Sequence, residues 1–200
     1  MNSMAKGSND VILRDRLQFD IDALGDTALV YGRIDLSDYV SIPENKGLAI
    51  KEIRFQMRDP TSAIGNWPVN LGLFDMATVG TQSRGALKVF ATTTAYEDVT
   101  DVGIASPNVI CVYTQDYVIN TDNGATYAWY DRRDEFFGTP DLHPEGYDVV
   151  TDLLIGVACD SIRGVSLEDS TVEIDVMLIA EPKKITQKDL TQMLTQAQDL

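Results

Sequence analysis

Apolar and polar residues alternate along much of this chain, and the alternation is clearest over residues 171–180. Four apolar side chains of that stretch share one parity: Val172, Ile174, Val176 and Leu178. Glu173 and Asp175 have the other parity, so the period of two predicts a β-strand with one buried face. Met177 and Ile179 replace the charges further along. We therefore expect the second half of this strand to be covered on both faces.

The same alternation recurs along the chain and predicts a series of strands separated by turn signals. The expected strands are residues 17–22, 28–36, 48–58, 69–76, 86–94, 109–119, 126–131, 149–159 and 171–180. The short connection between the first two strands predicts a hairpin. Since no helical pattern interrupts the series, the sequence predicts an all-β fold, an antiparallel β-sandwich.

Local signals refine this plan at three places. The buried parity changes at Lys51 and Glu52, which predicts a β-bulge there. Asn123 and Gly124 form the pair that favours a type I′ turn, so they predict a hairpin between the strands on either side. Residues 132–146 show no clear periodicity, and we expect an irregular segment there.

One helix is predicted at the end of the chain. Thr186 and Asp189 have the spacing of a capping box. An apolar stripe follows at helical spacing: Leu190, Met193, Leu194 and Ala197. A helix of about a dozen residues is marginal in isolation. This one must therefore dock, either on its own sandwich or on a neighbouring subunit.

The pattern divides the chain into an extended N-terminal arm over residues 1–16, a sandwich domain over residues 17–181, and a linker with the helix over residues 182–200. The 200 residues carry a net charge of −15. The first and last of these segments each hold +1, so the sandwich domain holds −17. Such a surface repels nucleic-acid phosphates and anionic membranes, so we expect no direct nucleic-acid binding. The weakly basic ends suit arms that dock on a neighbouring subunit.

Compartment signals are few. The first residues lack the apolar core of a signal peptide, and no apolar run reaches the ~20 residues of a membrane span. We expect a protein made in a cytoplasm, with no transmembrane segment. Cys111 and Cys159 lie in apolar runs, which predicts buried free thiols, although the sequence leaves a disulfide between them open.

Residues that carry chemistry are scarce. His143 is the single histidine, which excludes metal sites that need two from one chain. Nucleophile-elbow, P-loop, dinucleotide-binding and Cys-x-x-Cys motifs are all absent. We therefore predict no catalytic residues, no cofactor and no enzymatic activity. The candidate metal ligands are Glu97, Asp98 and Asp101, since calcium prefers acidic loops that supply hard oxygen ligands.

Aromatic and arginine side chains are concentrated in one part of the chain. The group comprises Tyr127, Trp129, Tyr130, Arg132, Arg133, Phe136 and Phe137. Its composition is typical of protein interfaces and of sugar-binding platforms. Burial in the core is a third interpretation, so the sequence leaves core, interface and ligand platform open. The interface hypothesis takes Trp129, Tyr130, Arg132, Arg133, Phe136 and Phe137 together with the stripe of the helix.

An all-β chain with an N-terminal arm and a C-terminal helix resembles the single jelly-roll capsid proteins of viruses. The resemblance implies a jelly-roll topology, symmetric self-association into a homo-oligomer, contacts with other virion proteins, a location in the virion, and no catalysis. Capsid proteins that package nucleic acid directly often have a strongly basic arm, which residues 1–16 lack. The alternatives are a carbohydrate- or ligand-binding β-sandwich module that uses calcium, and a phage tail, fibre or baseplate subunit.

Overall fold

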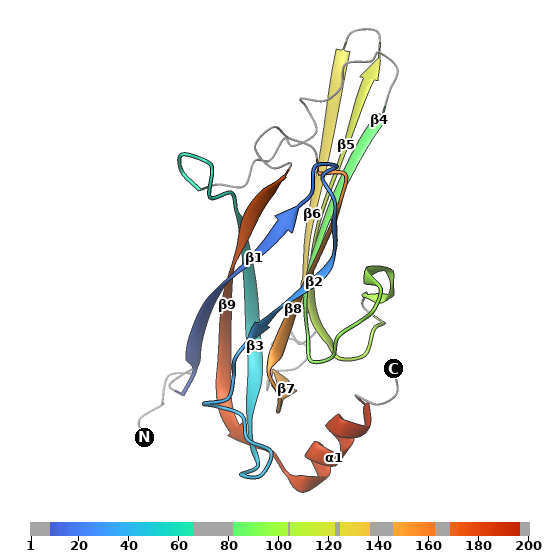
Figure 1. Cartoon of the computed structure of the whole chain (residues 1–200). Helices are drawn as coiled ribbons and strands as arrows, with labels where there is room; N and C mark the ends of the chain where they lie inside the picture. The colour runs from blue at the N-terminus through green and yellow to red at the C-terminus, as the bar shows by residue number, and fades with distance from the viewer. Residues whose placement is uncertain are drawn as a thin grey trace, which may run out of the picture.

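Two antiparallel β-sheets pack face to face in the computed structural model, which describes residues 9–65, 82–103, 105–122, 125–136, 146–162 and 169–196 (Figure 1). Sheet A has the strand order β1 (Val11–Ile21), β9 (Ser170–Lys184), β3 (Lys46–Arg58) and β7 (Tyr147–Val149). Sheet B has the order β2 (Thr27–Ile34), β8 (Leu153–Asp160), β4 (Gln82–Thr92), β5 (Val109–Asp122) and β6 (Ala125–Phe136). The described helices are the 3₁₀ turn η2 (Val99–Asp101) and α1 (Gln187–Gln196). The predicted all-β sandwich is confirmed.

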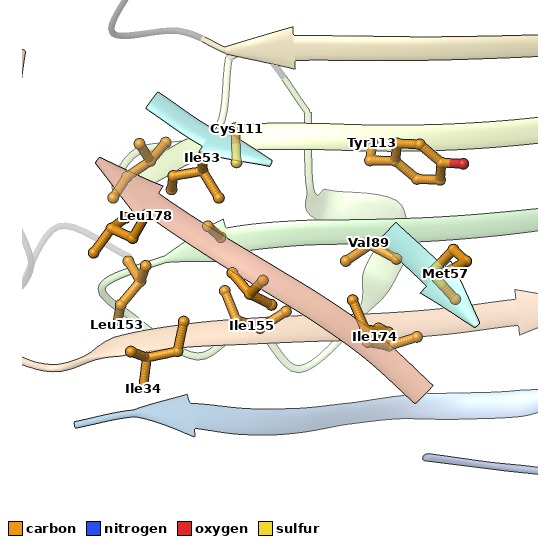
Figure 2. Close-up of a cluster of buried hydrophobic side chains, with 14 of the residues drawn as sticks. Ile34, Ile53, Met57, Val89, Cys111, Tyr113, Leu153, Ile155, Ile174 and Leu178 are labelled. Atoms are coloured by element: carbon orange, nitrogen blue, oxygen red, sulfur yellow. The ribbon is translucent and has the colours of Figure 1, made fainter. Parts of the chain in front are cut away.

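The core lies between the sheets, and β9 contributes its apolar parity to it. The five inward residues are at most 2% exposed: Val172, Ile174, Val176, Leu178 and Ala180. Figure 2 shows Ile174 and Leu178 in one cluster with Val89 and Ile155 of sheet B. On the opposite face of β9, Met177 and Ile179 are half-buried. The predicted cover on both faces is therefore only partial.

The predicted β-bulge is confirmed. Pairing between β3 and β9 passes from Ile50 directly to Glu52, which leaves Lys51 without a partner in the ladder. The extra residue restores one buried parity on both sides of the bulge. Lys51 uses its displaced position to form two ion pairs, with Nζ 2.6 Å from a carboxylate oxygen of Asp10 and 2.6 Å from one of Glu181.

The predicted hairpin of the first two strands is wrong. β1 pairs with β9 in sheet A, whereas β2 pairs with β8 in sheet B. The connection between them crosses from one sheet to the other. Asp22 shapes this turn, because its Oδ1 accepts hydrogen bonds from the amides of Leu24 at 2.8 Å and Asp26 at 2.9 Å. Gly25 completes it with a φ of +81°, which is strained for other residues.

The boundary of the N-terminal arm needs correction. β1 begins at Val11 and pairs with β9 along its whole length, so residues 11–16 belong to sheet A rather than to an arm over residues 1–16. Val11 and Leu13 pack against the core from this part of the strand. Three successive charged residues, 14–16, hide the alternation in the sequence. At the other end, β9 continues past residue 181 to Lys184.

The predicted hairpin between β5 and β6 is confirmed by its register. Asp122 pairs with Ala125, so two residues connect the strands, and those two lie outside the described part of the chain. β6 extends to Phe136, which pairs with Cys111. The expected irregular segment therefore begins later than residue 132. Pairing with β5 satisfies the backbone hydrogen-bonding groups of this part of β6, so the strand forms without a periodic pattern of side chains.

The remaining strand pairings are nested. With β6 set aside, the first strand pairs with the last, the second with the second to last, the third with β7, and β4 with β5. The predicted strand over residues 149–159 is divided into β7 and β8, because Asp152 leaves the ladder and accepts a hydrogen bond from the amide of Leu36 at 3.0 Å. The strand expected over residues 69–76 lies outside the described residues.

Both cysteines are buried, and neither forms a disulfide. Cys111 on β5 pairs with Ala91 of β4, and Cys159 on β8 pairs with Leu87 of β4. Because β4 lies between the two cysteines, they do not form the disulfide that the sequence left open. Burial raises the pKa of the Cys159 thiol to about 11.

We expect the native protein to react very slowly with a chromogenic thiol reagent at pH 8, because the thiolate is the reactive form and both sulfurs are shielded. Denaturant should release two thiols per chain at once, and absorbance records both steps. Rapid reaction of either thiol before unfolding would contradict the buried positions.

Candidate functional site

The predicted calcium ligands lie in an exposed loop on the outer side of sheet B. Glu97, Asp98 and Asp101 are all exposed. Asp98 caps η2, since its Oδ1 accepts a hydrogen bond from the amide of Thr100 at 2.8 Å, and this bond lowers the pKa of the carboxyl group. Within the described residues, no group of three or more acidic, histidine or cysteine side chains could hold a metal ion. The structure therefore does not bring these three carboxylates together as a metal site.

The aromatic and arginine group lies on β6, which forms one edge of sheet B. Its members follow the register of β5: Trp129 pairs with Val118, Tyr130 with Tyr117, Arg132 with Gln115, Arg133 with Thr114 and Phe136 with Cys111. β4, β5 and β6 run past the end of sheet A (Figure 1). Phe137 lies outside the described residues. The choice between core, interface and ligand platform stays a prediction.

The C-terminal helix docks on its own sandwich. Leu190 is only 7% exposed and packs with Val150 and Ile185, and Met193 packs against the same cluster. The structure therefore corrects the assignment of Leu190 and Met193 to a surface that waits for another subunit. The side chain of Leu194 and the whole of Ala197 lie outside the description.

The cap of this helix agrees with the sequence. The amide of Asp189 donates a hydrogen bond to Oγ1 of Thr186 at 3.2 Å, and the hydroxyl donates in turn to the Asp189 carboxylate at 2.6 Å. The predicted capping box is thus present, with the hydroxyl of Thr186 rather than its amide as the partner of the carboxylate. This cap fixes where α1 begins and hence which side of it meets the sandwich.

The outer face of sheet A carries a group of charged side chains that the sequence analysis did not predict to form a site. β9 lies between β1 and β3, and its even-numbered side chains fill the core, so its odd-numbered side chains face outward. Register places the outward residues of the three strands in rows. We call these nine residues the arginine face, with the rows Arg14–Met177–Arg54, Arg16–Asp175–Gln56 and Gln18–Glu173–Arg58.

Two arginines of this face are committed to the acids of β9. Nε of Arg16 lies 2.6 Å from Oδ1 of Asp175 and 3.6 Å from Oε2 of Glu173. Nη1 of Arg58 lies 3.3 Å from the same Glu173 oxygen. Gln18 adds a hydrogen bond to Glu173 at 3.2 Å. The hydrogen bond with Asp175 raises the pKa of Arg16, and Glu173 is only 9% exposed.

The other two arginines are open to solvent and flank Met177. Arg54 forms an ion pair with Glu52 on its own strand, and both side chains are well exposed, so water competes with this contact. Arg14 is exposed and has no ion-pair partner in the described part of the chain. One strand separates the two positions, so their Cα atoms are roughly 10 Å apart. Guanidinium groups bind carboxylates through paired hydrogen bonds, which makes this pair a receptor for acidic groups.

A groove of about 710 Å³ lies over the first two rows of the arginine face. Its walls comprise Arg14, Asp15, Arg16, Arg54, Phe55, Gln56, Asp175, Val176 and Met177. Arginine, methionine and aromatic residues are enriched in protein interfaces. Next to the groove, Ile12 is 53% exposed and pairs with Ile179, which extends the face with aliphatic surface. The arginine face therefore has the composition of a docking surface.

Sequence reasoning missed this site, although one signal for it was visible. Arg14 and Arg16 are two residues apart and Arg54 and Arg58 are four apart, and either spacing places both members of a pair on one strand face. Each pair looks like an ordinary solvated face when its strand is considered separately. The strand order that joins the two pairs through β9 is not encoded in any local pattern.

No protein-family model matches this chain, and neither does any curated protein. In the part of the chain that the structure describes, no helix has the length and apolar character to cross a membrane. The functional argument therefore rests on the geometry of the arginine face.

Proposed function

We propose that this protein is a structural subunit that self-assembles into a symmetric shell or virion-like particle, without catalysis. The arginine face is the observation that carries the proposal. It presents two solvent-exposed guanidinium groups around a half-buried methionine, on the outer face of a four-stranded sheet. Arginine at the centre of such a surface is typical of the residues that dominate binding energy.

The nested strand pairings support a jelly-roll topology as part of this proposal. A jelly roll has eight strands in two sheets with two Greek keys, and it is the fold of many viral capsid domains. The eight strands that remain when β6 is set aside pair first with last and onward to the middle. Fold does not determine function, because the same architecture serves lectins and enzymes. The topology therefore raises the weight of the capsid hypothesis without replacing the argument from the surface.

A ligand-binding β-sandwich module is the second candidate. The volume of the groove favours it, since about 710 Å³ lies within the range of small-molecule sites. Against it, the groove is walled by charged side chains that are mostly exposed, whereas ligand sites are mainly apolar and enclosed. A phage tail, fibre or baseplate subunit remains a variant of the assembly proposal, with the same kind of contact and a different symmetry.

Assembly should depend on ionic strength, because a domain with a net charge of −17 repels its copies. Salt screens that repulsion within about 8 Å at physiological ionic strength. We expect light scattering and electron microscopy of the purified protein to show large symmetric particles, favoured at moderate salt. Calcium should promote them further at equal ionic strength if carboxylates face one another between subunits. A strict monomer at every concentration and salt would refute the proposal.

A further inference from the structure

We infer that the arginine face of one subunit binds the acidic loop over residues 93–103 of a second copy of this chain. The inference rests on the proposed self-assembly and assigns its contact. Three observations support it: two solvent-exposed guanidinium groups lie on one side of the molecule, that of Arg14 and that of Arg54 with its exposed Glu52 pair; a hydrogen-bonded acidic loop lies on the other side; and the two cannot meet within one subunit.

The receptor is the pair formed by Arg14 and Arg54. The carboxylates of β9 already hold the other two arginines of the face, as described above. A carboxylate that approaches Met177 from solvent therefore meets one guanidinium on each side. The thioether of Met177 between them adapts to the apolar part of an incoming chain.

The acidic loop is well suited to enter the groove. Residues 93–103 contain Glu97, Asp98 and Asp101 and no basic residue. All three carboxylates are exposed. The hydrogen bond from the amide of Thr100 lowers the pKa of the Asp98 carboxyl group and so favours its charged form. A charge of −3 over eleven residues complements the two open arginines.

The loop is fixed before any partner arrives. The hydroxyl of Tyr31 accepts a hydrogen bond from the amide of Tyr96 at 2.7 Å and lies 3.0 Å from the carbonyl oxygen of the same residue. Nζ of Lys88 donates to the carbonyl oxygen of Val99 at 3.1 Å and also to that of Val102. A preorganised loop loses little conformational entropy on docking, which favours affinity.

The two surfaces face in opposite directions. Val102 packs with Phe90 and Val112 on the side of sheet B that faces away from sheet A. Figure 1 shows the loop, in green, on that side, while β1, β9 and β3 form the opposite side. The loop and the arginine face therefore meet only between copies. Such a head-to-tail contact builds a ring if its rotation closes and an open filament if it does not.

A charge swap tests the contact. The variant Arg14→Glu/Arg54→Glu should assemble only at a concentration at least roughly tenfold higher than the unmodified chain, since close charge pairs couple strongly. Glu97→Lys/Asp101→Lys should show the same loss, and it spares the cap at Asp98. Combining all four substitutions should restore assembly, because the charges are again complementary. Sedimentation velocity at fixed salt measures each variant.

The control matched to Arg14→Glu/Arg54→Glu is Lys184→Glu/Lys188→Glu, which makes the same change in net charge at two exposed positions outside the groove. It should assemble like the unmodified protein. Loss of assembly in this control, or no restoration in the fourfold variant, would overturn the inference and leave self-assembly standing. Equal assembly of all variants would also overturn it. An unmodified chain that stays monomeric would refute the proposed function and the inference together.

Discussion

Ile174→Ala is expected to lower the free energy of unfolding by about 2–5 kcal/mol, since it removes a fully buried branched side chain from the inner face of β9. Ile174 pairs with Leu17 on β1 and with Met57 on β3, and its side chain reaches the inner face of sheet B (Figure 2). Neighbours on three strands are held in ladders and cannot move in to fill the space, so most of the cavity should persist.

Chemical denaturation measures the effect as a lower midpoint with an unchanged slope. Gln56→Ala is the matched control, because Gln56 is an exposed residue of the arginine face on β3. The control should change stability by no more than about 0.5 kcal/mol. A loss below about 1 kcal/mol in Ile174→Ala would mean that the sheets close over the gap, and that the interior is looser than the ladders imply.

Local chemistry explains the parts of the fold that the sequence predicted. The parity change at Lys51 and Glu52 became a bulge because a strand with one buried face needs an extra residue there. Thr186 and Asp189 are three residues apart and cap α1 directly. The alternation of β9 can be recognised from the residues of that strand alone. Each signal acts over a few positions, so it can be read without knowing the neighbours of the element.

Long-range arrangement explains what the sequence did not predict. The short connection after β1 suggested a hairpin, but the turn at Asp22 crosses to the second sheet. The partners of β1 and β2 lie in the last third of the chain, where no local signal identifies them. The candidate site failed to emerge for the same reason. Arg14 and Arg54 come to lie on one face only because their strands both pair with β9.

The basic residues near the N-terminus belong to the candidate contact surface, but they lie on a strand and not on an arm. The net charge of +1 over residues 1–16 suggested an arm that reaches a neighbouring subunit. Two of the three basic residues in that segment, Arg14 and Arg16, instead lie on β1 and form one side of the groove. The expected contact with another subunit survives as a proposal, but a sheet face replaces the arm.

Leu190→Asp tests the finding that the C-terminal helix closes its own sandwich rather than joining subunits. A carboxylate cannot remain beside Val150 and Ile185 without a partner, because burial of an unpaired charge costs several kcal/mol. The helix should therefore leave its site, and the stability lost is the free energy of docking it. Burial of a leucine side chain contributes about 1.5–3 kcal/mol, so we expect a loss of that size in thermal melting.

Lys188→Asp is the control, since Lys188 is exposed on the same helix and near its N-terminus, where an acidic residue is tolerated. Its melting temperature should stay close to that of the unmodified protein. Sedimentation should show that Leu190→Asp still assembles at a temperature where it is folded, because the helix packs on its own chain and the arginine face is intact. Unchanged melting with assembly lost would reverse this conclusion. It would mean that Leu190 exchanges its place on the sandwich for one on a neighbouring subunit.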